Sequence, residues 1–146
     1  MAALSWYICS SMIGHREAAS YRLEEDCERY IRKAVPAILE KWDFEAWRSR
    51  CAGEWLQTLK MPRERRRFKD YKALFGEFRH ADEPQGSVVS DTTTGIVDIS
   101  GYYTVPVRFS RGRADVTMKL IKRAGGWKFQ RFTLRSDLID ASTDED

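Results

Sequence analysis

The fold is decided by residues 99–135, ISGYYTVPVRFSRGRADVTMKLIKRAGGWKFQRFTLR. This stretch predicts three β-strands joined by two tight turns. We expect the strands at Ile99–Ser110, Arg113–Arg123 and Trp127–Arg135, and the turns at Arg111–Gly112 and Gly125–Gly126. Apolar and polar residues alternate along the first two strands, which is typical of a sheet with one buried face. Such a face needs a cover, and the residues before it predict helices that supply one.

Three irregularities predict that the sheet is bent and has two unequal faces. Gly101 predicts a bulge, and Pro106 should lie at an edge or an irregularity because it cannot donate a hydrogen bond to a neighbouring strand. In the last strand the apolar phase changes between Phe129 and Phe132. That change predicts either a bulge or a strand that is covered on both faces.

The helical cover is expected in three pieces, His15–Lys41, Phe44–Leu59 and Pro62–Gly76. Pro36 should kink or break the first helix near Arg32–Val35. Asp43 is a suitable N-cap for the second helix. Trp42, Trp47 and Trp55 predict an aromatic cluster in the core, on the inner side of the sheet.

These elements predict an α+β protein, with three N-terminal helices packed on a strongly bent antiparallel sheet of about four strands. A first strand at Glu77–Val89 would be interrupted at 84–86, and Ser90–Gly95 would form a mobile polar loop. The 146 residues fit one domain at 15–136. An apolar arm at 1–14 precedes it, and an acidic, disordered tail at 137–146 follows it.

The composition favours a folded protein without a metal or a cofactor. The chain is 42% hydrophobic and 32% charged, and its net charge of +3 permits an anionic partner without requiring one. Its three cysteines form no C-x-x-C pair, and two histidines are too few for a zinc site. If the first two helices reverse near Trp42, Cys27 and Cys51 lie roughly 9 Å out of step, so we expect free thiols rather than a disulfide.

The segment Ala2–Ile13 is apolar and uncharged, but it is shorter than the roughly 20 residues that span a bilayer. It has no basic start and no clear cleavage site, so it is not typical of a signal peptide. Two interpretations stay open. The segment packs on the domain as a helix or arm, which leaves a cytoplasmic location, or it is the end of a truncated membrane anchor, which implies a membrane-associated or periplasmic one.

The final hairpins carry a family resemblance. Ala114–Leu120 leads through Gly125-Gly126 to Trp127-Lys128-Phe129, and then to Phe132 and Leu134. This order is similar to the end of many members of the nuclear-transport-factor-2-like superfamily, whose fold is a cystatin-like α+β cone. The segment Leu74–Phe78, LFGEF, also resembles bacterial members of unassigned function. The resemblance covers Tyr21–Arg135 and implies the fold more than any activity, because this superfamily includes enzymes, binding modules and assembly domains.

Two functions follow from the residues and the resemblance together. The first is a non-enzymatic binding or assembly domain, tethered to a membrane if the anchor exists, because no nucleophile motif or phosphate loop is visible. The resemblance adds a homodimer, since the open sheet face of this family often pairs with a second copy. The alternative is an isomerase or dehydratase that needs a general base and a hydrogen-bond donor in an apolar pocket. Its candidates are Asp98 and Tyr103, followed by Asp115 and Tyr102.

The expected third helix is the most basic segment of the chain. Its cationic side chains are Arg63, Arg65, Arg66, Arg67, Lys69 and Lys72. They form either an ordinary solvated face or a site for an anionic partner, such as a membrane surface or a protein. The segment lacks the interleaved aromatic residues of nucleic-acid-binding surfaces, so nucleic acid is disfavoured as the partner.

Overall fold

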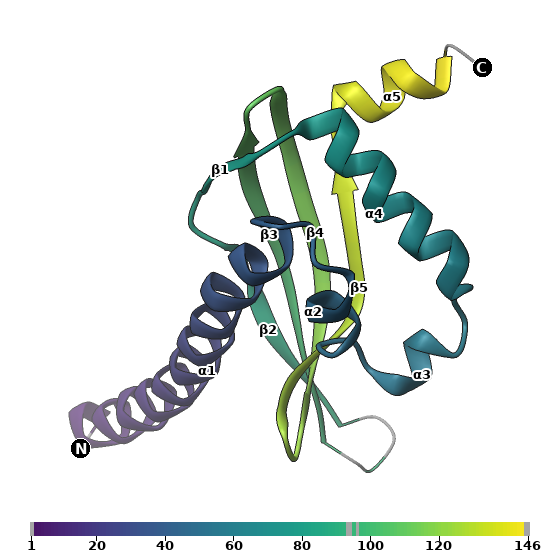
Figure 1. Cartoon of the computed structure of the whole chain (residues 1–146). Helices are drawn as coiled ribbons and strands as arrows, with labels where there is room; N and C mark the ends of the chain where they lie inside the picture. Colours follow the sequence, from purple (N-terminus) through teal and green to yellow (C-terminus); the bar gives the residue numbers. More distant parts are fainter. Residues whose placement is uncertain (1, 93–94, 96, 145–146) are drawn as a thin grey trace.

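The computed structural model describes residues 2–92, 95 and 97–144, with side chains for 21–92, 95 and 97–140. The chain is α+β, with helices packed on a five-stranded antiparallel sheet that does not close (Figure 1). The helices are α1 Ala2–Leu39, α2 Phe44–Arg48, α3 Gly53–Leu56, α4 Met61–Phe75 and α5 Asp137–Asp144. The strands are β1 Phe78–Ala81, β2 Gln85–Asp91, β3 Asp98–Phe109, β4 Gly112–Arg123 and β5 Gly126–Arg135. The α+β class and the antiparallel sheet are confirmed, whereas the helices and strands are more numerous than expected.

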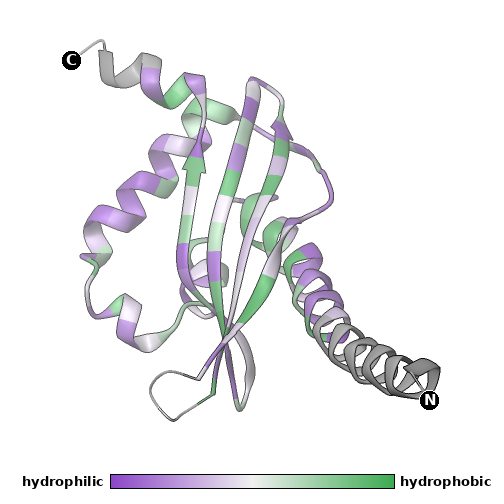
Figure 2. Ribbon diagram, turned by 180° about the vertical axis from the view of Figure 1, so that it is seen from behind, coloured by the Kyte–Doolittle hydropathy of each residue, from purple (hydrophilic) through white to green (hydrophobic). Residues whose placement is uncertain are grey.

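The predicted three-stranded stretch is the centre of the sheet. Strands β3, β4 and β5 pair in sequence, and β1 and β2 both pair with β3. The connecting turns are at 110–111 and 124–125, one residue earlier than expected. Alternate residues of these strands point to the helices and are buried, as the hydropathy colouring in Figure 2 illustrates. We call this side the inner face and the opposite side the outer face.

The expected first strand is two strands with a gap between them. β1 ends with Ala81 opposite Val107, and β2 begins with Gln85 opposite Thr104. Pro106 lies opposite this gap, where its carbonyl accepts a hydrogen bond from the Asp82 N–H at 2.8 Å. The predicted irregularity at Pro106 is therefore confirmed. Of the expected polar loop at 90–95, Ser90 and Asp91 belong to β2, whereas 93 and 94 lie outside the described residues.

One predicted bulge is wrong and the other is confirmed. The pairing of β3 runs through Gly101 without a shift in register. A Cβ at Gly101 would lie 2.9 Å from the Cys27 Sγ atom, so this glycine permits the close approach of α1 instead. In β5, Arg131 pairs with Lys119 while Phe129 pairs with Leu120, which leaves Gln130 as the extra residue of a bulge.

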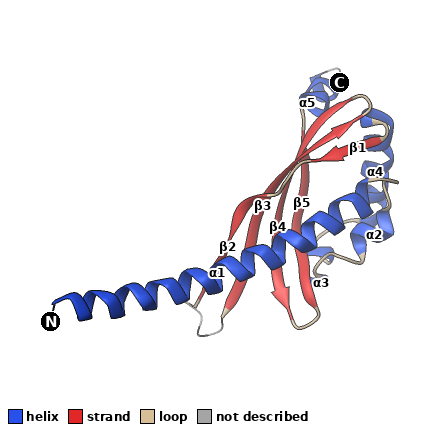
Figure 3. Cartoon of the chain, turned by 90° about the vertical axis from the view of Figure 1, so that its left-hand side faces the viewer, coloured by secondary structure: helices blue, strands red, loops and turns tan. Residues whose placement is uncertain are grey.

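Helix α1 is longer and more continuous than predicted. It begins at Ala2, so the expected arm is part of the helix, and it does not break at Pro36. Pro36 lies in the last turn, where its missing N–H removes a single helical hydrogen bond, while its own carbonyl still accepts from Glu40. The buried stripe from Cys27 to Leu39 covers the inner face, and the N-terminal half extends beyond the sheet (Figure 3).

The predicted second helix is wrong, because it is two short helices separated by a paired segment. Asp43 caps α2 as expected, since its Oδ1 atom accepts from the Ala46 N–H at 3.1 Å. Cys51 then forms a parallel bridge with Phe129 of β5. The Ala52 N–H donates to the Phe129 carbonyl at 2.8 Å, and the Phe129 N–H donates to Arg50 at 2.9 Å. These bonds hold Cys51 and Ala52 against β5, so a single helix cannot pass through them.

The two remaining helices are α4 and α5. α4 agrees with the predicted third helix, and Gly76 ends it with a φ of 77°. Where we expected a disordered tail, the chain forms α5. Leu138 and Ile139 of α5 pack against the core, which gives this short acidic helix an apolar attachment.

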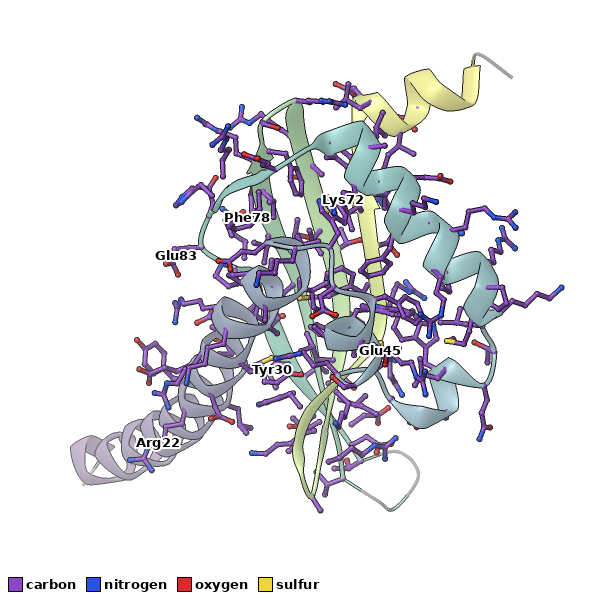
Figure 4. All side chains as sticks on the ribbon, in the orientation of Figure 1. Arg22, Tyr30, Glu45, Lys72, Phe78 and Glu83 are labelled. Carbon is purple, nitrogen blue, oxygen red and sulfur yellow. The ribbon has the colours of Figure 1, made fainter. Side chains whose placement is uncertain are left out.

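The space between helices and sheet is filled with side chains (Figure 4). Trp42 stacks on Phe75 and Phe109, with ring centroids 6.0 and 5.2 Å apart, and Trp47 meets Trp55 edge-on at 5.6 Å. The predicted aromatic cluster is therefore confirmed as core packing. The inner-face residues that share this core are Tyr103, Val105, Val107, Phe109, Ala114, Val116, Met118, Leu120, Phe129 and Leu134.

Candidate functional site

The two predicted catalytic residues lie on opposite faces of the sheet. Asp98 is exposed at the start of β3 on the outer face, opposite Asp91 of β2. Tyr103, five residues later on the same unbroken strand, points inward and is 2% exposed. The inward turn that a bulge at Gly101 would have given Asp98 does not occur. Asp115 and Tyr102 are also on the outer face and exposed, so none of these carboxylates joins Tyr103.

Tyr103 is nonetheless an unusual core residue. Among the buried side-chain polar atoms that the structure describes, its hydroxyl is the one without a hydrogen-bond partner. Burial raises the pKa of its phenol strongly, and the nearby Cys27 and Glu28 of α1 add to the effect. Burial likewise raises the pKa of the Glu28 carboxyl. The arrangement keeps Tyr103 protonated as a donor, but it does not supply a base.

The two described thiols are buried and unpaired, as predicted. Burial raises the pKa of both Cys27 and Cys51 to about 12, so almost no thiolate exists near neutral pH.

In a Cys9→Ser background, we expect no measurable reaction of the native protein with a thiol reagent at pH 8. Two thiols should react once urea unfolds the chain. Rapid labelling of two thiols in the native protein would contradict this arrangement.

The basic residues of α4 are all exposed, but two of them have partners within the chain. Arg65 pairs with Glu45 of α2 at 3.1 Å and lies 4.4 Å from the centre of the Phe44 ring. Arg67 contacts Glu64 at 3.5 Å. In the described part of the chain, the four predicted cations without an ion pair are Arg63, Arg66, Lys69 and Lys72. The candidate anionic-partner surface therefore reduces to these four side chains.

The apolar end of α1 and the basic side of α4 point away from each other. In both Figure 1 and Figure 3, the N-terminal half of α1 projects from the side of the molecule remote from α4. Among the helices that the structure describes, none is both long and apolar enough to cross a membrane.

The outer face of the sheet carries charges in a definite order. Its residues form rows across the strands, because residues in register share a face. From one end of the strands to the other, the rows are His80–Arg108–Arg113; Pro106–Asp115–Arg135; Gln85–Thr104–Thr117–Thr133; Ser87–Tyr102–Lys119–Arg131; Val89–Ser100–Ile121–Lys128; and Asp91–Asp98. One end row therefore has two arginines beside His80, the other end row has two aspartates, and threonines lie near the middle.

No described helix packs along the middle of this face, which Figure 2 shows from the front. Tyr102 is 49% exposed and Val89 is 48% exposed. A hollow of about 260 Å³ lies over Thr104, Thr117 and Lys119. A larger hollow of about 650 Å³ lies between the arginine row and α5. The face therefore has apolar, uncharged and charged regions that are open to a partner.

Glu64 is a candidate that the sequence interpretation passed over. It is 7% exposed and is the one buried charged residue among those described. It lines a crevice of about 50 Å³ between α4 and β5. The signal was present in the sequence, because Glu64 occupies an apolar position of the stripe Met61, Glu64, Phe68, Tyr71 and Phe75.

Comparisons with known proteins add no family or function to this geometry. No protein-family model matches the chain, and neither curated proteins nor solved structures gave a match.

Proposed function

We propose that this protein is a non-enzymatic assembly domain that pairs with a second copy through the outer face of its sheet. The observation that carries the proposal is the order of charges on that face, from the Arg108–Arg113 row to the Asp91–Asp98 row. Arginines placed directly opposite each other on neighbouring strands repel, so this row is unfavourable within one chain. In the described part of the chain, neither Arg108 nor Arg113 has an ion-pair partner.

A two-fold axis perpendicular to the strands would resolve this repulsion. Such an axis near the threonine row lays two outer faces together with their strands running in opposite directions. Arg108 of each copy then lies opposite Asp98 of the other, because both residues are on β3, and the threonine row lies opposite the row of Tyr102. The Arg108–Asp98 contact occurs twice, once on each side of the axis, as a symmetric dimer requires.

The resemblance to the nuclear-transport-factor-2-like superfamily agrees with this proposal, because many of its members pair through the sheet. The separation of Asp98 from Tyr103 also supports it over the enzymatic alternative. A catalytic pair would need both groups on one side of the sheet.

Charge reversal tests the proposal directly. Size-exclusion chromatography with light scattering at micromolar concentration should give a dimer for the native chain. The double variants Arg108→Glu/Arg113→Glu and Asp91→Lys/Asp98→Lys should each be monomers, because each opposes like charges twice in the dimer. An equimolar mixture of the two variants should form a dimer again, since the side chains at 108 of one chain and 98 of the other are then of opposite sign at both contacts.

The matched control is Arg63→Glu/Arg66→Glu, which changes the charge equally on α4 and should leave the dimer intact. A native chain that stays monomeric would refute the proposal. A dimer that survives both reversals, or a mixture that stays monomeric, would also refute it.

A further inference from the structure

The crevice between α4 and β5 contains a carboxylate in an unusual environment. Glu64 comes from the first turns of α4, and its side chain is 9% exposed. The rings of Trp42, Trp47 and Phe68 line the same crevice. Burying a carboxylate among aromatic rings is costly unless a cation or several hydrogen bonds compensate it.

The compensation within the chain is weak. Arg67 approaches Glu64 from one helical turn away, but the Nη1 to Oε2 distance is 3.5 Å, which is long for a charged hydrogen bond. The Arg67 side chain is 45% exposed, so it can turn out into water. The negative charge of Glu64 is therefore only partly neutralised by its neighbours in the chain.

The aromatic walls of the crevice, together with the carboxylate, suit a cation. Aromatic faces attract ammonium groups, and a carboxylate at the end of such a site supplies the counter-charge. Tyr71 lines the same crevice, and burial raises the pKa of its phenol, so it stays neutral. The volume of about 50 Å³ has room for about four water-sized groups, which is the size of a small ammonium head group.

We propose that this crevice binds a small organic ammonium head group, with Glu64 as its counter-ion, the aromatic rings as its walls, and Arg67 as the side chain that the ligand displaces. The site lies on the inner side of the sheet and does not depend on the proposed dimer. The head group can belong to a free amine or to a lysine side chain of another protein, since both present the same chemistry.

Two probes distinguish these sources. Tetramethylammonium chloride represents a free quaternary amine, and Nα-acetyl-lysine methylamide represents a lysine side chain. Each is titrated into the full chain at constant ionic strength against sodium chloride, with tryptophan fluorescence and tryptophan NMR resonances as readouts, because Trp42 and Trp47 line the crevice. We expect saturable binding of at least one probe, and the stronger of the two identifies the source.

Three variants make the result specific. Glu64→Gln should weaken binding at least tenfold, because it removes the counter-ion. Arg67→Gln should tighten binding several-fold, because it removes the competing cation. Asp70→Asn, an exposed carboxylate on the same helix, is the matched control and should change nothing.

The proposal is overturned if neither probe binds the native chain. Binding that Glu64→Gln leaves unchanged, or that Asp70→Asn weakens equally, also overturns it. If circular dichroism shows that Glu64→Gln does not fold, the Arg67→Gln variant decides. Binding that fails to tighten in that variant then counts against the site.

Discussion

Replacing Trp42 by alanine should lower the free energy of unfolding by about 3–5 kcal/mol, the usual cost of removing a large buried aromatic side chain. Trp42 joins the end of α1 to α4 and to the sheet, since its ring contacts Phe68, Tyr71, Phe75 and Phe109. Its indole N–H donates to the Gly76 carbonyl at 3.1 Å, so the variant also leaves an acceptor unpaired.

The backbone conformation of Trp42 also affects the stability of its variants. Its φ is 49°, the left-handed region that bulky residues avoid, and it is the one described non-glycine residue with a positive φ. Trp42→Gly relieves this strain and should be slightly more stable than Trp42→Ala, although both lose the ring. Glycine more stable than alanine is the order expected after a helix C-terminus at a positive φ, so this comparison tests the backbone geometry.

Urea unfolding followed by circular dichroism measures these differences. Trp55→Ala is the matched control, because Trp55 is only partly buried and has one described ring contact, with Trp47. We expect this control to lose less than half as much stability as Trp42→Ala. An equal loss in the two variants would show that Trp42 is not the central contact.

Replacing Gly86 by alanine should destabilise the protein by about 3 kcal/mol, the upper end of the usual cost of overpacking. A Cβ at this position would overlap the Tyr102 carbonyl oxygen of β3. That oxygen belongs to the backbone at the centre of the sheet, so it cannot move without shifting the register of β2. We therefore expect local loss of the β2–β3 pairing as well as lower stability.

Amide hydrogen exchange at 85–91 and urea unfolding measure the two effects. Gly53→Ala is the control, because a Cβ at that position would meet no atom within 4 Å beyond its chain neighbours and its own helix backbone. It begins α3, where alanine should be neutral or slightly stabilising. Unchanged protection of β2 in Gly86→Ala would contradict the close approach of the two strands.

Local chemistry explains most of what the sequence predicted correctly. The alternation of Tyr103, Val105 and Val107 marked the inner face, and Asp43 and Gly76 marked helix ends, because each signal acts within a few residues. The bulge in β5 was visible for the same reason, as a change in the apolar phase.

Three of the errors depend on contacts between distant parts of the chain. The split of the second helix results from hydrogen bonds between Ala52 and Phe129, 77 residues later. The role of Gly101 depends on Cys27, which no local pattern connects to it. For Glu64 the apolar stripe was visible, but its charge favoured a solvated position, so only packing shows that it is buried.

The broken edges of the sheet influence how the protein can aggregate. An uninterrupted edge strand exposes a row of unpaired backbone groups that can recruit further strands without limit. Here one edge is divided between β1 and β2, with a shift in register after Phe78, and the other edge contains the bulge at Gln130. These interruptions oppose growth into fibrils and leave the outer face as the larger continuous surface. Association of this protein should therefore stop at a closed assembly.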